Sequence, residues 1–335
     1  MEEKKVVIVG AGPAGATCGI LLRRKNIDCV LIDRAVFPRD KICGGGLTPR
    51  SYKLLMRMLP DFKYEYNSVR RLKLSIEGEK VLDFLMDEEI RIVKRREFDS
   101  LLLAKYQEEG GDFINEALIG IEEQGDKVIV TLKNGRKIAC DYLVGADGAN
   151  SRVRRYLNPN ATHGILCMEQ YGPKGDEEAI VGNLSRFYRQ GYYYSFPNKD
   201  YDVQGFGDYM TTPQGFRMVL RQMGCPDLKA LGAYIPQKIN YPIRKNIILI
   251  GDAGGFPNRL TFEGLYYAFL TAGNAALAIS SGMPFCMTNK KVFDDKNIEE
   301  YAARIFYSGM GLAVLKFFCK TMPSVVTWAF NRAAR

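Results

Sequence analysis

Hydrophobic and polar residues near the N-terminus alternate in blocks that predict a strand, a helix and a second strand. The apolar run VVIVG at 6–10 ends in glycine, and the run CVLID at 29–33 ends in an acid. Short continuous apolar runs of this kind are typical of buried parallel strands. The small and aliphatic residues between them, which end in two arginines, favour a helix. The pattern therefore predicts a β–α–β unit.

Three glycines mark the turn between the first strand and the helix. Gly10, Gly12 and Gly15 have G-x-G-x-x-G spacing. In such a turn the first glycine permits the tight bend, the second lets the backbone approach a pyrophosphate, and the third brings helix and strand together. Asp33 lies eighteen residues after Gly15, close to where a ribose-binding carboxylate is expected. We expect this unit to bind a dinucleotide.

Two later strands also end in glycine and aspartate. The segment DYLVGADGANSRVRR at 141–155 predicts a strand, then Asp147 and Gly148, then a helix capped by Asn150 or Ser151. The segment at 246–273 predicts a strand that ends at Gly251 and Asp252, a loop and a long helix. Ligands of open α/β sheets bind at the carboxyl ends of strands. These strand ends are therefore expected to meet at one ligand.

The remaining pattern predicts hairpins and aromatic strands. Alternation on both sides of Glu77-Gly78 indicates one hairpin, and an Asn134-Gly135 turn indicates another. Residues 96–110 and the segment MTTPQGFRMVLRQMG are each typical of a helix. Residues 161–209 predict short aromatic strands, among them GYYYSFP at 191–197.

Two stretches resemble membrane segments in length. Residues 264–283 carry no charge, but they are rich in Gly, Ala, Ser and Thr and follow an expected ligand loop, so we expect a buried helix. Residues 310–330 mix apolar residues with Lys316 and Lys320 and are interrupted by Pro323. They predict an amphipathic helix pair that packs on the body of the protein or lies on a bilayer surface.

Composition narrows the compartment and the partners. Among 335 residues, 47 basic and 38 acidic residues give a net charge of +9, but the basic ones form short scattered clusters, so we expect no nucleic acid partner. Eight cysteines without a C-x-x-C pair, and no apolar signal segment before the first strand, indicate reduced thiols and a cytoplasmic location. The one histidine, His163, is expected in an ordinary strand or loop, with no metal site.

The three glycine and aspartate motifs together resemble FAD-dependent oxidoreductases of the p-hydroxybenzoate hydroxylase type, and most closely the geranylgeranyl reductase family. KICGGGL at 41–47 is similar to the family segment beside the flavin, and EGLYYAF at 263–269 is similar to its Glu-Gly-Ile-Tyr-Tyr-Ala. The spacing Y-x-Y-x-F-P at 192–197 resembles the Tyr-x-Trp-x-Phe-Pro that lines the substrate cavity of that family.

The resemblance implies an α/β fold with three parts. A Rossmann-like FAD-binding domain would comprise residues 1–57, 90–155 and 240–285, interrupted by an antiparallel-sheet substrate-binding domain. The substrate-binding domain would comprise residues 58–89 and 156–239, and C-terminal helices would occupy residues 286–335.

The resemblance also assigns site residues. Cys43 would lie by the flavin and tune it or contact substrate, or else pack as a structural thiol. The substrate would contact Tyr192, Tyr194, Phe196, Pro197 and Phe262. The residues expected to bind FAD are Gly10, Gly12, Pro13, Ala14, Gly15, Asp33, Arg34, Lys41, Cys43, Gly44, Gly45, Arg96, Asp147, Gly148, Asp252, Gly264 and Leu265.

Four positions depart from the family pattern. Arg189 and Arg259 stand where proline is usual, Tyr194 stands where tryptophan is usual, and Phe262 replaces a glycine. We expect the ring of Phe262 to narrow the approach to the flavin and Arg259 to add a charge there. Both changes bear on whether a long isoprenoid fits.

The expected activity is that of a reductase. FAD, reduced by NAD(P)H bound transiently or by a redox protein, would pass hydride to a carbon–carbon double bond of an isoprenoid or other apolar or lipid substrate. A monooxygenase that hydroxylates an aromatic or lipid substrate is the alternative, since the fold serves both chemistries. A poorly active flavin- and lipid-binding protein is a third possibility. The C-terminal helices would bring the enzyme to the periphery of a membrane.

Overall fold

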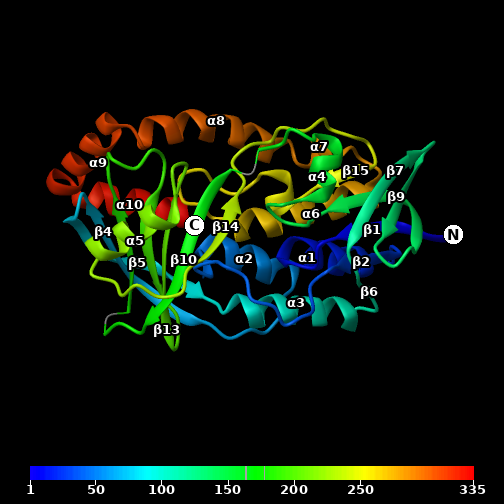
Figure 1. The fold of residues 1–335 in the computed structure, drawn as a ribbon, viewed down its shortest axis with the longest axis horizontal. Helices are drawn as coiled ribbons and strands as arrows, with labels where there is room; N and C mark the ends of the chain where they lie inside the picture. Colours follow the sequence, from blue (N-terminus) through cyan, green and yellow to red (C-terminus); the bar gives the residue numbers. More distant parts are fainter. Residues whose placement is uncertain (163, 177) are drawn as a thin grey trace.

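The computed structural model of the protein describes residues 1–162, 164–176 and 178–335. His163 lies outside the described residues. Two sheets stand next to each other along the long axis of the molecule, and the N-terminus lies at the outer end of the first (Figure 1).

The first sheet confirms the predicted parallel core. Its strands follow the order β6, β2, β1, β9, and the second half of β9 pairs in parallel with β15 while its first half pairs antiparallel with β8, which leads to β7. The turn at Asn134-Gly135 joins β8 to β9, as predicted. The bounds are β1 Glu2–Val9, β2 Cys29–Asp33, β6 Asp112–Asn115, β7 Leu118–Gln124, β8 Lys127–Leu132, β9 Lys137–Gly145 and β15 Ile247–Leu249.

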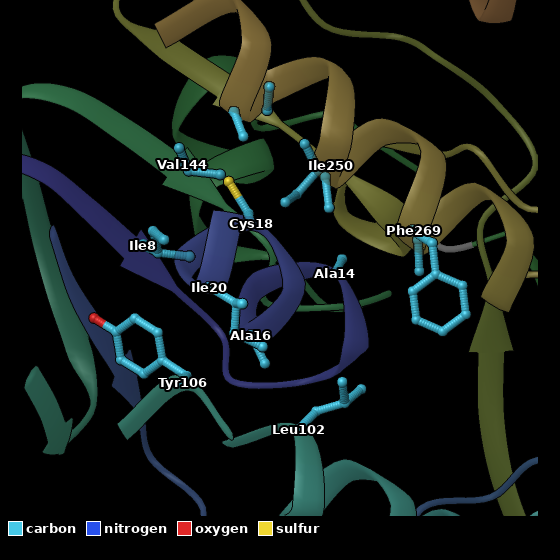
Figure 2. Packing of buried hydrophobic residues seen from close by; sticks show 14 of the residues in the cluster. Ile8, Ala14, Ala16, Cys18, Ile20, Leu102, Tyr106, Val144, Ile250 and Phe269 are labelled. Carbon is cyan, nitrogen blue, oxygen red and sulfur yellow. The ribbon is translucent and has the colours of Figure 1, made fainter. Parts of the chain in front are cut away.

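Helices α1 (Pro13–Arg23), α3 (Arg95–Glu108) and α6 (Leu265–Ser281) pack together beside this sheet. Figure 2 shows α1 at the centre, with Cys18 directed toward Val144 and α6, and Ile8 on the neighbouring strand. The small residues of α6, such as Ala272 and Ala275, are fully buried and allow close approach of α1. Most of the stretch 264–283 therefore forms a largely buried helix, as predicted.

The second sheet has eight strands in the order β14, β10, β13, β12, β11, β4, β5, β3. All neighbours are antiparallel except β11 and β4. The hairpin at Glu77-Gly78 is confirmed, but β5 runs past residue 89 to Ile92, so it extends into the expected FAD-binding part. The bounds are β3 Gly46–Leu47, β4 Asn67–Ile76, β5 Glu79–Ile92, β10 Ile165–Pro173, β11 Ala179–Leu184, β12 Tyr192–Pro197, β13 Tyr201–Asp208 and β14 Leu231–Ile235.

The two faces of the second sheet have different coverings. Helix α5 (Pro213–Gln222) packs Phe216 against Tyr193 and Phe206 on one face. The other face carries Tyr192, Leu74 and Leu82 and meets the C-terminal helices. Successive side chains of a strand point to opposite faces, so Tyr194 and Phe196 lie on the same face as Tyr192.

Four helices close the chain along one edge and one end of the molecule (Figure 1). They are α7 (Phe285–Thr288), α8 (Lys290–Phe306), α9 (Gly309–Thr321) and α10 (Pro323–Ala334), so the predicted break at Pro323 is confirmed. Within the described ranges no single helix is long and apolar enough to cross a membrane. Helices α8 and α9 pass that test only as a pair, bent by 80°.

Candidate active site

The glycine turn after β1 has the features that a phosphate cradle requires. Gly10 has a φ of +106°, and a Cβ there would collide with the Ala146 carbonyl. A Cβ at Gly15 would collide with the Gly10 carbonyl. A Cβ at Gly12, by contrast, would come near only the Arg39 guanidinium, at 3.4 Å. Gly12 therefore borders open space at the N-terminus of α1, where free amides and the helix dipole favour an anion.

Asp33 and the first residues of α1 complete this cradle. The Asp33 carboxylate accepts hydrogen bonds from the amides of Ala11, at 2.7 Å, and Ala35, at 2.8 Å, and is only partly buried. Pro13 and Ala14 are buried in the first turn of α1. Arg34, next to Asp33, is exposed.

Asp147 and Gly148 lie beside the same turn. Asp147 Oδ2 accepts a hydrogen bond from the Arg152 amide at 2.6 Å, so it caps α4 (Arg152–Leu157) together with Ser151. Its Oδ1 is buried and has no hydrogen-bond partner among the described residues. Gly148 has a φ of +75° and open space around its Cβ position. The aspartate is therefore both a helix cap and a free acceptor.

The loop that follows β2 contacts the loop that precedes α6. Lys41 Nζ lies 3.6 Å from Asp252 Oδ2 in the short helix η1 (Gly251–Gly254). A Cβ at Gly264 would lie 3.3 Å from Asp252 Oδ1, and Leu265 begins α6 directly after it. The tertiary structure thus brings together four residues that we assigned to FAD from separate parts of the sequence.

Glu263 holds this junction in place. Its carboxylate accepts hydrogen bonds from Arg50 Nε at 3.0 Å and from Ser51 Oγ at 2.9 Å, at the start of α2 (Pro49–Met58). The Thr48 hydroxyl also donates to it. The residues that follow KICGGGL are therefore bonded to a buried carboxylate of the EGLYYAF segment.

Cys43 is half-buried and faces a cation that we did not assign. The Gly45 amide donates to Cys43 Sγ at 3.4 Å. Arg95 is buried next to it, and although burial opposes the charge, Asp99 and Cys43 raise the pKa of Arg95 above its usual range. Asp99 accepts from Arg95 at 2.8 Å. Arg96, which we had placed on the cofactor side, has a 54% exposed side chain and pairs with Asp40 at 3.0 Å.

An aromatic wall, formed by Tyr192, Tyr194 and Phe196, lies beneath the Cys43 loop. The ring centroids of Tyr192 and Tyr194 are 5.8 Å apart, and those of Tyr194 and Phe196 are 5.5 Å apart. A Cβ at Gly44 or Gly46 would lie 2.9 Å from the Phe196 ring, so only glycine permits this approach. Pro197 is buried at the end of the strand.

Phe262 covers one end of the aromatic wall. Its ring stacks on Tyr192 with centroids 5.0 Å apart and an interplanar angle of 17°. Its φ is +57°, in the left-handed region that glycine adopts at least cost. This backbone geometry gives a physical reason for the glycine usual at this position in the family.

Glu169 on β10 is a site residue that the sequence analysis missed. It is 3% exposed, its Oε1 accepts a hydrogen bond from the Tyr194 hydroxyl, and its Oε2 has no partner among the described residues. Burial raises the pKa of Glu169 to about 7, although Tyr194, the Cys43 amide and the nearby cations Lys41 and Arg95 oppose that rise. A lone acid within an otherwise apolar predicted strand was the available signal.

Comparison with known proteins shows which proteins this chain is similar to. The family described as FAD binding domain matches residues 3–166. An uncharacterized protein of Methanosarcina barkeri is 29% identical, covering 96% of this chain and 86% of its own. Menaquinone reductase of Mycolicibacterium smegmatis is 27% identical, covering 92% and 84%. Geranylgeranyl diphosphate reductase of Rhodobacter capsulatus is 27% identical, covering 83% and 76%.

Solved structures agree on the fold. A geranylgeranyl bacteriochlorophyll reductase-like protein from Thermoplasma acidophilum superposes with a TM-score of 0.75 at 19% identity, covering 98% of this chain and 90% of its own. The fold is also shared with the halogenase PltM, at a TM-score of 0.74 and 16% identity, covering 91% of this chain and 76% of its own. At these identities the likeness shows the fold alone.

Proposed function

We propose that this chain, which has an FAD binding domain over residues 3–166 and is similar to geranylgeranyl and menaquinone reductases, is a reductase. It adds two hydrogens across a carbon–carbon double bond of an isoprenoid chain or another apolar substrate. The observation that carries this proposal is the buried carboxyl of Glu169, bonded to Tyr194 in the aromatic wall.

The arrangement of the site residues fits FAD. The open space at Gly12 and the free amides of α1 suit a diphosphate, and the partly exposed carboxylate of Asp33 suits a ribose. The unpartnered oxygen of Asp147 is a further acceptor beside them. Bound and reduced, FAD supplies the hydride.

Reduction of a double bond needs a proton as well as a hydride. Tyr194 donates that proton to the second carbon of the double bond, and the Glu169 carboxyl returns one to Tyr194. Burial keeps Glu169 protonated up to about pH 7, so it holds a proton near neutral pH. Solvent then restores the proton of Glu169. A hydroxylation would need no such donor at the substrate carbon.

Cys43 and Arg95 have a positioning role in this proposal. The buried Arg95–Asp99 pair fixes a positive charge beside Cys43. That charge stabilises negative charge developing on the cofactor side of the pocket. The electron donor is NAD(P)H bound transiently, or a redox protein.

The test uses protein loaded with FAD and reduced by dithionite. Geranylgeranyl diphosphate or a menaquinone with an unsaturated side chain is incubated with this protein, once without oxygen and once in air. The masses of the products are then measured by mass spectrometry. We expect a gain of two hydrogens without oxygen. A gain of one oxygen atom only in air would instead establish a monooxygenase.

Two variants separate the role of the proton donor from folding. Tyr194→Phe keeps the wall but removes the hydroxyl, and we expect a slower anaerobic product step with FAD binding unchanged. Glu122→Gln, on the exposed strand β7, is the matched control and should behave as the parent. Equal product rates in Tyr194→Phe and parent would exclude this route for the proton.

A further inference from the structure

A cavity of about 600 Å³ lies outside the residues assigned to the cofactor and the aromatic wall, and its lining includes Arg189 and Arg259, which depart from the family pattern. It opens between α8, the residues just before β12 and just after β13, and the loop at 257–262. Its lining includes four cations: Arg189, Lys238, Arg259 and Arg304. We refer to it as the cationic cavity.

The charges in the cationic cavity are not balanced. Glu300 is the acid in its lining, and this one carboxylate pairs with both Arg259, at 3.1 Å, and Arg304, at 2.9 Å. Among the described residues, no carboxylate lies within ion-pair distance of the Arg189 or Lys238 side chain. Four cations against one carboxylate leave an excess of three positive charges, which favours a multiply charged anion.

Arg259 is the buried member of this set. It is 7% exposed, and its Nε is buried with no hydrogen-bond partner among the described residues. Its backbone is held in place by the Glu299 carboxylate, which accepts from the Arg259 amide at 3.2 Å. A buried charged donor without a partner is costly, and the planar guanidinium matches the oxygens of a phosphate.

The cationic cavity adjoins the aromatic wall. Tyr307, which lines the cavity, donates to the Leu260 carbonyl at 2.6 Å. Tyr192, at the end of the wall, donates to the next carbonyl, that of Thr261, at 2.5 Å. The two tyrosines therefore hold the same short loop, one from the cavity and one from the wall.

We propose that the cationic cavity binds the phosphate or diphosphate group of an amphiphilic substrate whose apolar chain lies along the aromatic wall. This inference rests on the proposed function for the chain, but the anion site itself does not. The phosphate could belong to a soluble prenyl diphosphate or to a phospholipid. In either case the central anion-binding side chain is Arg259, which stands where proline is usual in the family.

The experiment measures binding to FAD-saturated protein by calorimetry, so that added diphosphate cannot occupy the cofactor site. The probes are inorganic diphosphate, geranylgeranyl diphosphate, geranylgeraniol and phosphatidylglycerol vesicles. We expect geranylgeranyl diphosphate to bind roughly tenfold or more tightly than geranylgeraniol, because charge-assisted hydrogen bonds are the strong ones. Binding to the vesicles but not to the diphosphate would assign the site to a phospholipid headgroup.

Arg259→Met should weaken binding of the phosphorylated probe by roughly tenfold or more, with geranylgeraniol unaffected. If Arg259→Met fails to fold, the double variant Arg189→Met with Lys238→Met changes only exposed residues and tests the same cavity. Arg217→Met, on an exposed arginine of α5, is the matched control.

Equal affinity for the diphosphate and the alcohol would overturn the inference, as would variants in the cavity that leave phosphate binding unchanged. These outcomes are independent of the proposed reductase. A protein that binds the phosphorylated probe through Arg259 but never reduces it would retain the anion site and refute the proposed activity. A protein that reduces geranylgeraniol as fast as its diphosphate would retain the proposed activity and refute the anion site.

Discussion

Tyr194 on β12 donates a hydrogen bond to the carboxyl group of Glu169 on β10, across the intervening strand β13. The pair joins a residue expected in the substrate pocket to an acid that the sequence analysis did not assign. Its burial has consequences for stability as well as for the proposed proton donor.

Glu169→Gln is expected to make the protein more stable at alkaline pH. Burial raises the pKa of Glu169 to about 7, so the folded protein keeps this proton up to about pH 7, whereas the ordinary pKa of a glutamate is 4.5. The stability that the neutral acid contributes is therefore fully present below pH 4.5 and is lost as pH rises through about 7. Between pH 5 and pH 8 the unfolding free energy of the variant should rise relative to the parent by up to about 3 kcal/mol.

Urea unfolding of FAD-saturated protein at both pH values measures this difference. Glu122→Gln, at the surface, should show no such change between them. The difference in unfolding free energy between the parent and Glu169→Gln is compared at the two pH values. If it is the same at pH 5 and pH 8, Glu169 does not titrate in this range.

Phe262→Gly and Phe262→Ala should separate backbone strain from ring packing. Both variants remove the ring that stacks on Tyr192, but only glycine adopts a φ of +57° at little cost. We expect the glycine variant to be more stable than the alanine variant by about 1 kcal/mol. Thermal unfolding of both proteins measures the difference, and equal stability would mean that the loop relaxes.

The same pair of variants tests whether Phe262 narrows the approach to the flavin. In both, acrylamide should quench the fluorescence of bound flavin more strongly than in the parent, because the ring no longer covers the end of the aromatic wall. Unchanged quenching would place the ring away from the entry route.

Gly12→Ala and Gly15→Ala are predicted to fail in different ways. A Cβ at 12 enters open space, so the fold should persist while FAD binding weakens roughly tenfold, since a backbone contact to a charged phosphate is lost. A Cβ at 15 would collide with the Gly10 carbonyl and prevent folding. Circular dichroism and FAD titration distinguish the two, and normal FAD affinity in Gly12→Ala would show that the diphosphate lies elsewhere.

Trp328 offers a direct probe of membrane contact. It is the one tryptophan of the sequence and is 61% exposed on α10. If the C-terminal helices rest on lipid, vesicles with anionic lipids should shift its emission to shorter wavelengths, and brominated acyl chains should quench it. Phe317→Ser, which removes an exposed ring from α9, should weaken both effects. An unchanged emission spectrum would rule out contact through α10.

The amino-acid sequence by itself determined the features that depend on neighbouring residues. The β–α–β unit was predictable because turn geometry and helix packing restrict positions 10 and 15 to glycine, while Gly12 leaves the space that a bound phosphate requires. The hairpins at Glu77-Gly78 and Asn134-Gly135 and the break at Pro323 follow from local backbone preferences in the same way.

Only the tertiary structure decided which side chains meet. It showed that Arg95 rather than Arg96 faces Cys43, because one face of α3 is buried and the adjacent position on the helix is exposed. It also placed Glu169 under Tyr194 and gathered the cationic cavity from segments far apart in the chain. Such contacts arise from the packing of two sheets and a long C-terminal helix, which local sequence patterns do not specify.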